Sequence, residues 1–468
     1  MLFAGRADQP AACLFYRPNK TAADNGEEPI VTVAPFVAEQ FANLPSNPGE
    51  QRDTWNIIIR PQDWREINRS EAQKGERLTW KLAMWGSERE RHLLNRLQRF
   101  ERFEDWAKSQ GIVDAQAPQL RKGPGKGLTL DKKLIGKKHL TFDNLRNVES
   151  IYALSQLPYQ LVPEEKCYIR DRGGRKGFEV CEPPHIILDA GRRFAIFSNE
   201  YCIPPSGQMA LHGKDEIQLK ALAAYLCSQT ARWFQFFVSS QWGIAASIAR
   251  QVDIGLLPIP FPMMPREKIE ELVSNYEALQ EHQERLQPDD KYFATLKQTL
   301  EEQIFDALKL RPHERDLIEG FFAGPWQLIK GKFPDAAVNP AEPADIRRYC
   351  RSLRRELDEY LQERGVRHQI TVTLDDKQVC LAVEGRRTGK AIEPVIHESN
   401  QGQSEVLKRI AKQLRQKHSQ RVYFEKSLFF YDHGRILFFK PRRRIEWNVR
   451  QAVLDADDLI GELLSGHD

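Results

Sequence analysis

The sequence predicts an α+β protein of several domains, with a strand-rich domain, a helical middle and a small α/β module at the C-terminus. Its 468 residues are enough for two to four domains with ordinary cores. Short apolar runs between turn residues fill residues 140–212, and a charged, amphipathic helical pattern follows from Glu267. After Gly365 the period changes from helical to the alternation that is typical of strands.

The first 117 residues combine short strands with a helical stretch. Proline and glycine mark turns in the first 60 residues. Leu78–Trp106 has helical periodicity, and Ser87 followed by Glu90 is typical of a capping box. The strand-like segments are Ala11–Arg17 and Ile30–Ala34.

A basic, linker-like stretch at residues 118–139 precedes the strand-rich block. Seven of its residues are Lys or Arg and one is acidic. A helix is expected from about Lys214 to Ser239, after the last strand of the block. The expected strands lie near Cys167–Arg170, Phe178–Cys181, His185–Leu188 and Arg193–Ser198.

Helices dominate the next part of the chain, and strands return near its end. Glu267 to about Leu310 is predicted to form two helices separated near Gln287–Asp290. A later helix, Pro343–Arg364, ends at Gly365, a residue type that favours helix C-termini. The remaining predicted elements are a helix at Glu314–Phe322, a β-hairpin at His368–Thr373 and Gln378–Glu384, a helix at Gln403–Lys417, a second hairpin at Val422–Phe430 and Arg435–Lys440, and a helix at Asn448–Leu464.

The composition excludes several classes of protein. Charged residues make up 29% and hydrophobic residues 41%, as in globular proteins, and a net charge of +4 is too small for a polycation. Seven cysteines occur without a Cys-x-x-Cys pair, which argues against a zinc site or a disulfide framework and favours reduced thiols in the cytoplasm. There is no signal-peptide pattern and no apolar run of about 18 residues, so we expect no membrane partner.

Four segments form a recognisable order along the chain. The most informative is Leu219–Pro262. It begins with a helix rich in small and aromatic residues, continues through Ser239–Gly243 and ends in a segment that contains several prolines. The other three are Ala4–Ala12, the Trp-Lys-x-x-x-Trp-Gly pattern of Trp80–Ser87, and Phe439–Pro441 with Trp447 and Ala452–Asp457. In this order the four segments resemble one part of the large adenine-specific DNA methyltransferases that belong to restriction-modification and phage-defence systems. That part begins at the end of the catalytic domain.

The resemblance implies a target-recognition portion whose cofactor domain is lost or lies on another chain. The family transfers a methyl group from S-adenosylmethionine to the amine of a flipped-out adenine. The expected partners are therefore double-stranded DNA and a catalytic methyltransferase subunit, which would bind S-adenosylmethionine, or other defence proteins. The implied parts are a catalytic-domain remnant and junction at 1–117, a basic linker loop at 118–139, a target-recognition domain at 140–262, a helical scaffold at 263–365 and a C-terminal α/β module at 366–468.

The residues that would perform methyl transfer are not found in the sequence. An amino-group methyltransferase needs a glycine-rich cofactor turn and an Asp/Asn-Pro-Pro-aromatic tetrad. Glu182–His185 has the wrong acidic residue and a His in place of the aromatic ring, and Gly123–Gly127 follows polar residues rather than a hydrophobic strand. We therefore expect no catalytic, cofactor-binding or metal site in this chain.

Basic residues gather in three segments where DNA contacts are predicted. A glycine-rich basic loop can follow a phosphate backbone, and an arginine at a hairpin tip can read guanine in the major groove. The plainer interpretations are a solvated linker and exposed turns. The predicted residues are Arg121, Lys122, Lys126, Lys132, Lys133, Lys137 and Lys138 in the loop, Arg170, Arg172, Arg175 and Lys176 at the tip, and Arg192 and Arg193 after Gly191.

Two further predictions of DNA contact concern Trp242 and the basic cluster around Pro441. Aromatic residues at a helix end are more often part of a core than in contact with a base, so both interpretations of Trp242 stay open. Pro441 ends a strand, which leaves the neighbouring basic side chains to bind phosphates, an acidic partner surface or nearby aspartates. This cluster consists of Lys440, Arg442, Arg443 and Arg444, and the aspartates are Asp455, Asp457 and Asp458.

Two other functions stay open: an assembly subunit of a defence complex, and an enzyme with an unrecognised active site. Salt-dependent DNA binding would separate DNA recognition from assembly. A nuclease-like pattern places Asp375 and Asp376 before a strand that ends Glu384-Gly385-Arg386. The lysine expected after the glutamate is replaced by arginine, and paired acidic residues at a turn are usually turn formers.

Overall fold

The structure, a computed structural model, divides into two compact units. Unit 1 combines Met1–Arg91 with Arg311–Asp468, and unit 2 is His92–Leu310. Helices and small sheets occur in both units, which confirms the predicted α+β class. The residues that the structure describes are 29–34, 37–41, 54–59, 63–116, 119–122, 134–141, 150–163, 167–170, 176–189, 194–204, 208–240, 242–243, 250–285, 289–329, 339–374, 378–398, 428–432 and 434–465.

These two units differ from the five consecutive parts that the sequence implied. Unit 1 joins residues before 92 to residues after 310. Helix α9 (Arg266–Gln283), which the implied scaffold at 263–365 includes, belongs to unit 2 because it packs against α6 (Glu216–Cys227) and buries Leu272, Tyr276 and Leu279. Burial of this apolar face, rather than position along the chain, decides where the helix belongs.

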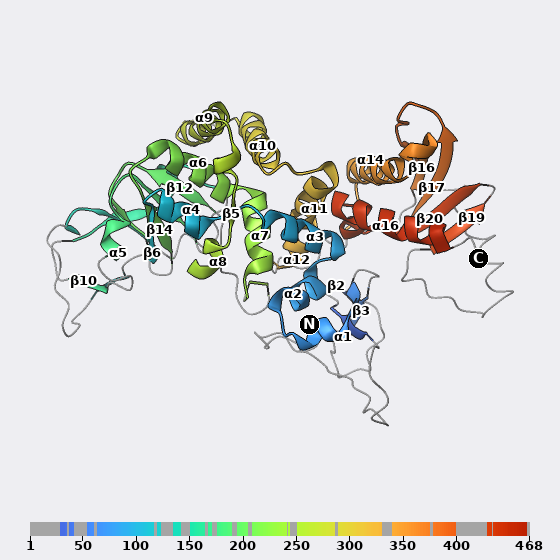
Figure 1. Cartoon of the computed structure of the whole chain (residues 1–468), viewed down its shortest axis with the longest axis horizontal. Coiled ribbons are helices and arrows are strands. Elements are labelled where there is room, and N and C mark those ends of the chain that lie inside the picture. Colours follow the sequence, from blue (N-terminus) through green and yellow to red (C-terminus); the bar gives the residue numbers. More distant parts are fainter. Residues whose placement is uncertain are drawn as a thin grey trace, which may run out of the picture. The chain divides into compact units, whose positions relative to one another are not determined.

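Unit 2 is organised by a four-stranded antiparallel sheet of order β12-β11-β14-β6 (Figure 1). Strand β11 (His185–Leu188) is buried along its whole length, and α6 packs against β11 and β12. The other strands of unit 2 are β5 (Glu101–Arg102), β6 (Val113–Gln116), β7 (Gln119–Lys122), β8 (Lys138–Leu140), β9 (Tyr159–Leu161), β10 (Cys167–Arg170), β12 (Ala195–Ser198), β13 (Cys202–Ile203), β14 (Met209–His212) and β15 (Pro258–Ile259).

The helices of unit 2 confirm some predicted boundaries and correct others. The predicted break between two helices lies at Asp289, whose carboxylate accepts hydrogen bonds from the backbone of Lys291 (2.9 Å) and Tyr292 (3.2 Å). The single helix predicted at Lys214–Ser239 is two helices, because Ser228 caps the second. The remaining helices are α4 (Phe103–Ser109), α5 (Lys176–Glu179), α7 (Gln229–Val238), α8 (Gln251–Gly255) and α10 (Asp290–Ala307).

The strand predicted at Phe178–Cys181 is wrong. Residues 176–179 form the short helix α5, and a turn follows in which the Cys181 amide donates to the Phe178 carbonyl (3.0 Å). Val180 and Cys181 are buried in a small hydrophobic cluster with Ala115 and Ala210. A helical turn buries these two consecutive side chains together, whereas a strand facing water on one side would have exposed one of them.

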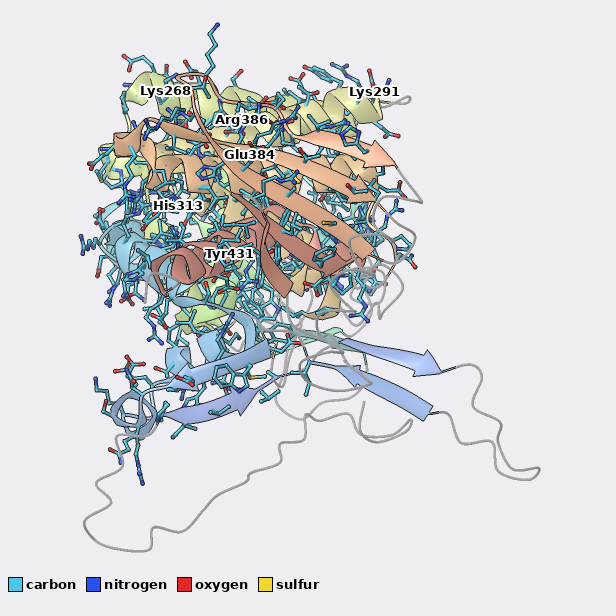
Figure 2. All side chains as sticks on the ribbon, turned by 90° about the vertical axis from the view of Figure 1, so that its right-hand side faces the viewer. Lys268, Lys291, His313, Glu384, Arg386 and Tyr431 are labelled. Atoms are coloured by element: carbon cyan, nitrogen blue, oxygen red, sulfur yellow. The ribbon has the colours of Figure 1, made fainter. Side chains whose placement is uncertain are left out.

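Unit 1 contains a five-stranded sheet of order β18-β16-β17-β20-β19. The predicted hairpin is confirmed as β16 (Val366–Leu374) paired with β17 (Gln378–Arg387), on which Figure 2 shows Glu384 and Arg386. The other elements are β1 (Ile30–Val33), β2 (Val37–Phe41), β3 (Thr54–Ile58), β4 (Trp64–Ile67), β18 (Val395–Glu398), β19 (Leu428–Asp432), β20 (Arg435–Pro441), α1 (Arg69–Gln73), α2 (Arg77–Trp85), α3 (Glu88–Leu97, crossing into unit 2), α11 (Pro312–Ala323), α12 (Pro325–Ile329), α14 (Pro343–Tyr360) and α16 (Val449–Ser465).

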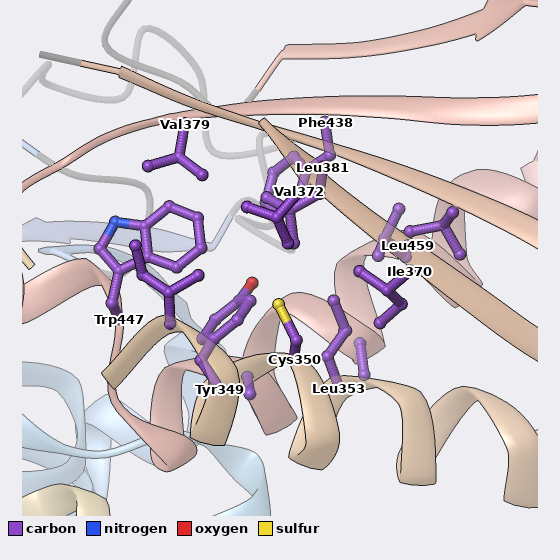
Figure 3. Packing of buried hydrophobic residues seen from close by; sticks show 14 of the residues in the cluster. Tyr349, Cys350, Leu353, Ile370, Val372, Val379, Leu381, Phe438, Trp447 and Leu459 are labelled. Carbon is purple, nitrogen blue, oxygen red and sulfur yellow. The ribbon is translucent and has the colours of Figure 1, made fainter. Parts of the chain in front are cut away.

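Helices α14 and α16 bury one face of this sheet. Alternate residues of β16, from His368 to Leu374, are buried, as expected for a strand with one face on a core. Figure 3 shows side chains from α14, the strands and α16 meeting in this core. Helix α14 is followed by a short turn of 3₁₀ helix and Gly365, where φ is +62°, which confirms the predicted end.

A buried ion pair lies inside this core. The Lys440 ammonium group contacts the Asp455 carboxylate and donates to the Glu446 carbonyl (2.8 Å), and both side chains are at most 3% exposed. Asp455 also accepts hydrogen bonds from the Tyr349 hydroxyl (2.5 Å) and the Gln451 amide (2.8 Å). The pair therefore links β20, α14 and α16, and its remaining polar atoms have partners.

A second buried pair joins the two sequence segments of unit 1. Arg450 contacts the Glu90 carboxylate and donates to the Trp85 carbonyl (3.2 Å). Gly320 of α11 lies against the Arg450 backbone: a Cβ atom on Gly320 would be 2.3 Å from the Arg450 nitrogen. The close approach of α11 and α16 thus requires glycine at this position.

We expect Lys440→Met to destabilise unit 1 by about 3–5 kcal/mol, because it leaves Asp455 buried without its counter-charge. The matched control is Arg386→Met, since the Arg386–Glu384 pair lies in the same sheet with both side chains at least 40% exposed. That control should cost less than about 1 kcal/mol. Urea unfolding of both variants measures the difference, and equal shifts would contradict the interpretation of the buried pair.

A second stability prediction concerns Gly320→Ala. The added methyl group overlaps the Arg450 backbone, so α11 and α16 must move apart at a cost of about 1–3 kcal/mol. Gly461→Ala is the matched control, because a Cβ atom at this exposed position of α16 meets no atom within 4 Å. The control should leave stability unchanged or raise it by up to about 1 kcal/mol. A urea unfolding midpoint for Gly320→Ala at or above that of the unmutated chain would show that α11 and α16 do not require glycine at this position.

Candidate nucleic-acid interface

The most informative predicted residues are Lys137 and Lys138, which lie at a small three-stranded sheet in unit 2. Its order is β13-β8-β9, with β8 parallel to β13 and antiparallel to β9. A turn precedes β8, in which the Lys137 amide donates to the Leu134 carbonyl (3.0 Å) and the Val162 amide donates to the Lys137 carbonyl (2.9 Å). These backbone bonds fix where the two lysines enter the sheet.

Each of the two lysines lies over a tyrosine ring. The Lys137 ammonium group is 5.1 Å from the centre of the Tyr201 ring, and that of Lys138 is 4.9 Å from the centre of the Tyr159 ring. Tyr159 is 49% exposed, and the neighbouring Leu161 is 58% exposed. Cations and exposed aromatic rings side by side are the groups that contact phosphates and unstacked bases. We call Lys137, Lys138, Tyr159, Leu161 and Tyr201 the lysine–tyrosine surface.

Charges within the sheet set the electrostatics of this surface. Lys138 forms an ion pair with Glu200, and a hydrogen bond from Lys138 to this carboxylate raises the pKa of Lys138. Lys137 forms no ion pair with another residue that the structure describes. Burial lowers the pKa of His139 to about 4, and its ring lies 3.4 Å from the Gln160 amide. At neutral pH the surface therefore carries its positive charge on lysine.

The sequence did not identify Tyr159 and Tyr201 as functional residues. Tyr159 pairs with Leu140 in the register between β8 and β9, and Tyr201 precedes β13. Both tyrosines reach the lysines only through strand pairing between segments that are separate in the sequence. Single aromatic residues near strand ends offer no local signal for such a pairing.

Two other predicted basic segments meet in a two-stranded ribbon. β7 pairs with β10 in antiparallel orientation, with Arg121 opposite Tyr168 and Arg170 opposite Gln119. Arg121, Lys122 and Arg170 thus share one ribbon, although the sequence placed them in a loop and in a separate hairpin tip. Lys176 is the first residue of α5. The other predicted residues lie outside the described residues: Lys126, Lys132, Lys133, Arg172, Arg175, Arg192 and Arg193.

Two predicted DNA contacts need correction. Trp242 is 1% exposed and packs edge-on against Phe236 (6.1 Å between ring centres), so its ring is part of the core. Lys440 belongs to the buried ion pair with Asp455 and cannot reach a phosphate in this fold. For Trp242 the structure favours the core interpretation that the sequence left open. Lys440 was predicted at the surface because a neighbouring proline does not reveal which face of a strand is covered.

The arginines after Pro441 hold the start of α14 in unit 1. Arg442 donates to the Ala341 carbonyl (3.0 Å), and Arg443 pairs with Pro340 in a β-bridge. Arg444 remains exposed and lies 3.4 Å from the Asp345 carboxylate. The acidic partner of Arg444 is therefore at the N-terminus of α14, where a carboxylate favours the helix. Of the three aspartates that the sequence suggested for the cluster, Asp455, Asp457 and Asp458, Asp455 pairs with Lys440 in the core.

Glu182–His185, the nearest match to a catalytic tetrad in the sequence, has a structural role. His185 is fully buried at the start of β11, and its Nδ1 lies 2.8 Å from the Val180 carbonyl. Burial lowers the pKa of His185. Because the His185 ring is buried, it cannot stack on an adenine. For the nuclease-like pattern, Asp375 and Asp376 lie outside the described residues, and Arg386 pairs with Glu384 (3.4 Å).

Comparison with models of known protein families found no match to this chain, and comparison with curated proteins found none either. No described helix is long and apolar enough to cross a membrane.

Acid should destabilise unit 2 through His139. The unfolded chain binds a proton on this histidine near pH 6.5, whereas the folded chain does so only near pH 4. The contribution of the neutral His139 ring to the free energy of unfolding is therefore fully present above about pH 6.5, and it is lost as the pH falls towards 4. His139→Gln should flatten this dependence, whereas His92→Gln, an exposed histidine of the same unit, should not. Urea midpoints between pH 4 and 7 test this, and an unchanged slope in His139→Gln would exclude His139 as the cause.

Proposed function

We propose that this chain is the DNA-binding, target-recognition part of an adenine-specific DNA methyltransferase system, without a methyl-transfer site of its own. The observation that supports DNA binding is the lysine–tyrosine surface, where Lys137 and Lys138 lie over Tyr201 and Tyr159. Lysine supplies sequence-independent attraction to phosphates, and an exposed tyrosine ring offers a stacking platform. The link to methyltransferases rests on the order of the four resembling segments alone.

The ribbon of β7 and β10 is a second group of basic residues in unit 2. It carries Arg121, Lys122 and Arg170 on two paired strands, and two-stranded ribbons fit the major groove of B-form DNA. The ion pair between Lys138 and Glu200 fits this proposal, because a phosphate can replace an exposed carboxylate as the partner of lysine. Contacts of this type give affinity and strong salt dependence with little sequence information.

DNA binding is tested by fluorescence anisotropy with a labelled duplex at two salt concentrations. We expect Lys137→Ala/Lys138→Ala to weaken binding and to lower the slope of log K against log salt by about 1–2, since each lysine that is removed leaves one phosphate without a protein cation. Lys268→Ala/Lys291→Ala is the matched control, since Figure 2 shows these exposed lysines on α9 and α10 and Lys268 also has an acidic partner, Glu271. The control should keep the slope of the unmutated chain.

Two results would contradict the proposal. If the chain fails to bind any duplex at low salt, DNA recognition by this chain is excluded. If the chain binds S-adenosylmethionine, it has a cofactor site, and the proposal that it lacks a methyl-transfer site is wrong. Equal weakening of binding in the two double variants would indicate general electrostatic attraction and would exclude a specific role for the lysine–tyrosine surface.

An assembly role in a defence complex is the second candidate function. Unit 2 exposes Val252 on α8 (72%) and Met263 in the turn before α9 (57%), and exposed apolar side chains mark a protein interface where they form a contiguous patch. This function predicts a complex with another protein and no binding to DNA. The anisotropy experiment separates the two functions directly.

A further inference from the structure

Three side chains of the kinds that bind metal ions meet between α11 and α14 in unit 1. His313 is the second residue of α11, and Glu356 and Glu359 lie one turn apart on α14. One ligand atom of each residue lies within 4.8 Å of the other two. Figure 2 labels His313 in this unit. Within the described residues no other three such side chains are this close.

Two arginines also contact this group, but each has a closer acidic partner. Arg89 lies 3.8 Å from Glu356, whereas it donates to Asp457 at 2.9 Å. Arg355 lies 3.3 Å from Glu356 and forms a closer pair with Asp316. If Glu356 turns towards a metal ion, both guanidinium groups keep a carboxylate. The arginines therefore do not need Glu356 as their counter-charge.

The charges around the group leave it negative. Four carboxylates face two guanidinium groups, and the ion pair of Arg311 and Glu314 beside His313 adds no net charge, so a net charge of −2 remains when the His313 ring is neutral. A divalent cation would balance this charge. The carboxylates are those of Asp316, Glu356, Glu359 and Asp457, and the guanidinium groups are those of Arg89 and Arg355.

The ligand types favour zinc over magnesium. Imidazole nitrogen and carboxylate oxygen both bind Zn²⁺ at about 2.0–2.2 Å, which places neighbouring ligand atoms roughly 3.3 Å apart. Glu359 is exposed and forms no ion pair with another described residue, so its side chain can rotate the short distance required.

We propose that His313, Glu356 and Glu359 bind a Zn²⁺ ion that joins α11 to α14, with water in the fourth position. This site was not expected from the sequence, which contains no Cys-x-x-Cys pair or His-x-x-x-His spacing around these residues. The ligands come from two helices, and only the packing of α11 against α14 brings them together. Zinc would stabilise unit 1 because a bound ion favours the folded state.

The test uses the full chain after EDTA treatment and dialysis. Co²⁺ titration followed by visible absorption reports coordination, and displacement of Co²⁺ by Zn²⁺ gives the zinc affinity. We expect about one equivalent of Zn²⁺ to bind, and His313→Ala and Glu359→Gln each to weaken binding at least tenfold. His397→Ala and Glu363→Gln are matched controls, since both residues are exposed in unit 1 and lie outside the group. They should keep the affinity of the unmutated chain.

Glu359→Gln keeps the test independent of folding. Its side chain is exposed and nearly unchanged in size, so the variant should unfold at the same urea concentration as the metal-free chain. If the unmutated chain binds no Zn²⁺, the proposal is wrong. Binding that is unaffected by both His313→Ala and Glu359→Gln would place zinc elsewhere and would equally overturn it.

Discussion

The ion pair between Lys440 and Asp455 constrains the whole sheet-and-helix core of unit 1. A charge removed from water needs a counter-charge and hydrogen bonds for its remaining polar atoms. Here the carboxylate comes from α16, one hydroxyl donor comes from Tyr349 on α14, and the ammonium group comes from β20. No one of these elements can shift along another without leaving a buried charge unpaired. Apolar packing in the same core has no such requirement, because hydrophobic contacts are not directional.

The parts of the fold that the sequence predicted depend on local signals. Asp289 caps α10 through its own neighbours, Gly365 follows the last turn after α14, and alternation along β16 records which face is buried. Each signal lies within a few residues of the feature that it predicts. A single sequence is therefore enough for these elements.

The parts that the sequence did not predict depend on distant partners. The pairing of β7 with β10 turned an expected loop and an expected hairpin tip into one ribbon. Lys440 was expected at the surface, with Asp455 as one possible partner there. Its burial was not foreseen, because its aromatic neighbours Tyr349 and Trp447 lie on other elements. For the same reason, the tyrosines of the lysine–tyrosine surface and the zinc ligands on α11 and α14 had no signal in the sequence. Burial of a charged residue depends on partners that only the fold supplies.

Most of the described residues on which the resemblance to methyltransferases rests are buried in the cores of the two units rather than exposed at their surfaces. Trp85 and Gly86 end α2, and the Trp85 carbonyl accepts a hydrogen bond from Arg450, two residues before the Ala452–Asp457 segment. Trp233, Phe236 and Trp242 are buried in unit 2. Residues of this kind define an architecture, and function depends on other side chains placed on it. The DNA binding that we propose accordingly depends on a different set of residues, which lie on or next to β8, β9 and β13.

The pair formed by Glu90 and Arg450 has a consequence for how the chain is made. These residues are 360 positions apart in the sequence, with all of unit 2 between them. At a synthesis rate of about 5–20 residues per second, Arg450 follows Glu90 by roughly 20–70 s. Unit 2 can form during this interval, whereas the Glu90 carboxylate, which also accepts a hydrogen bond from the Ser87 hydroxyl, still lacks Arg450. On the ribosome, unit 2 is therefore expected to be complete before the segment that carries Glu90 gains its contact with α16.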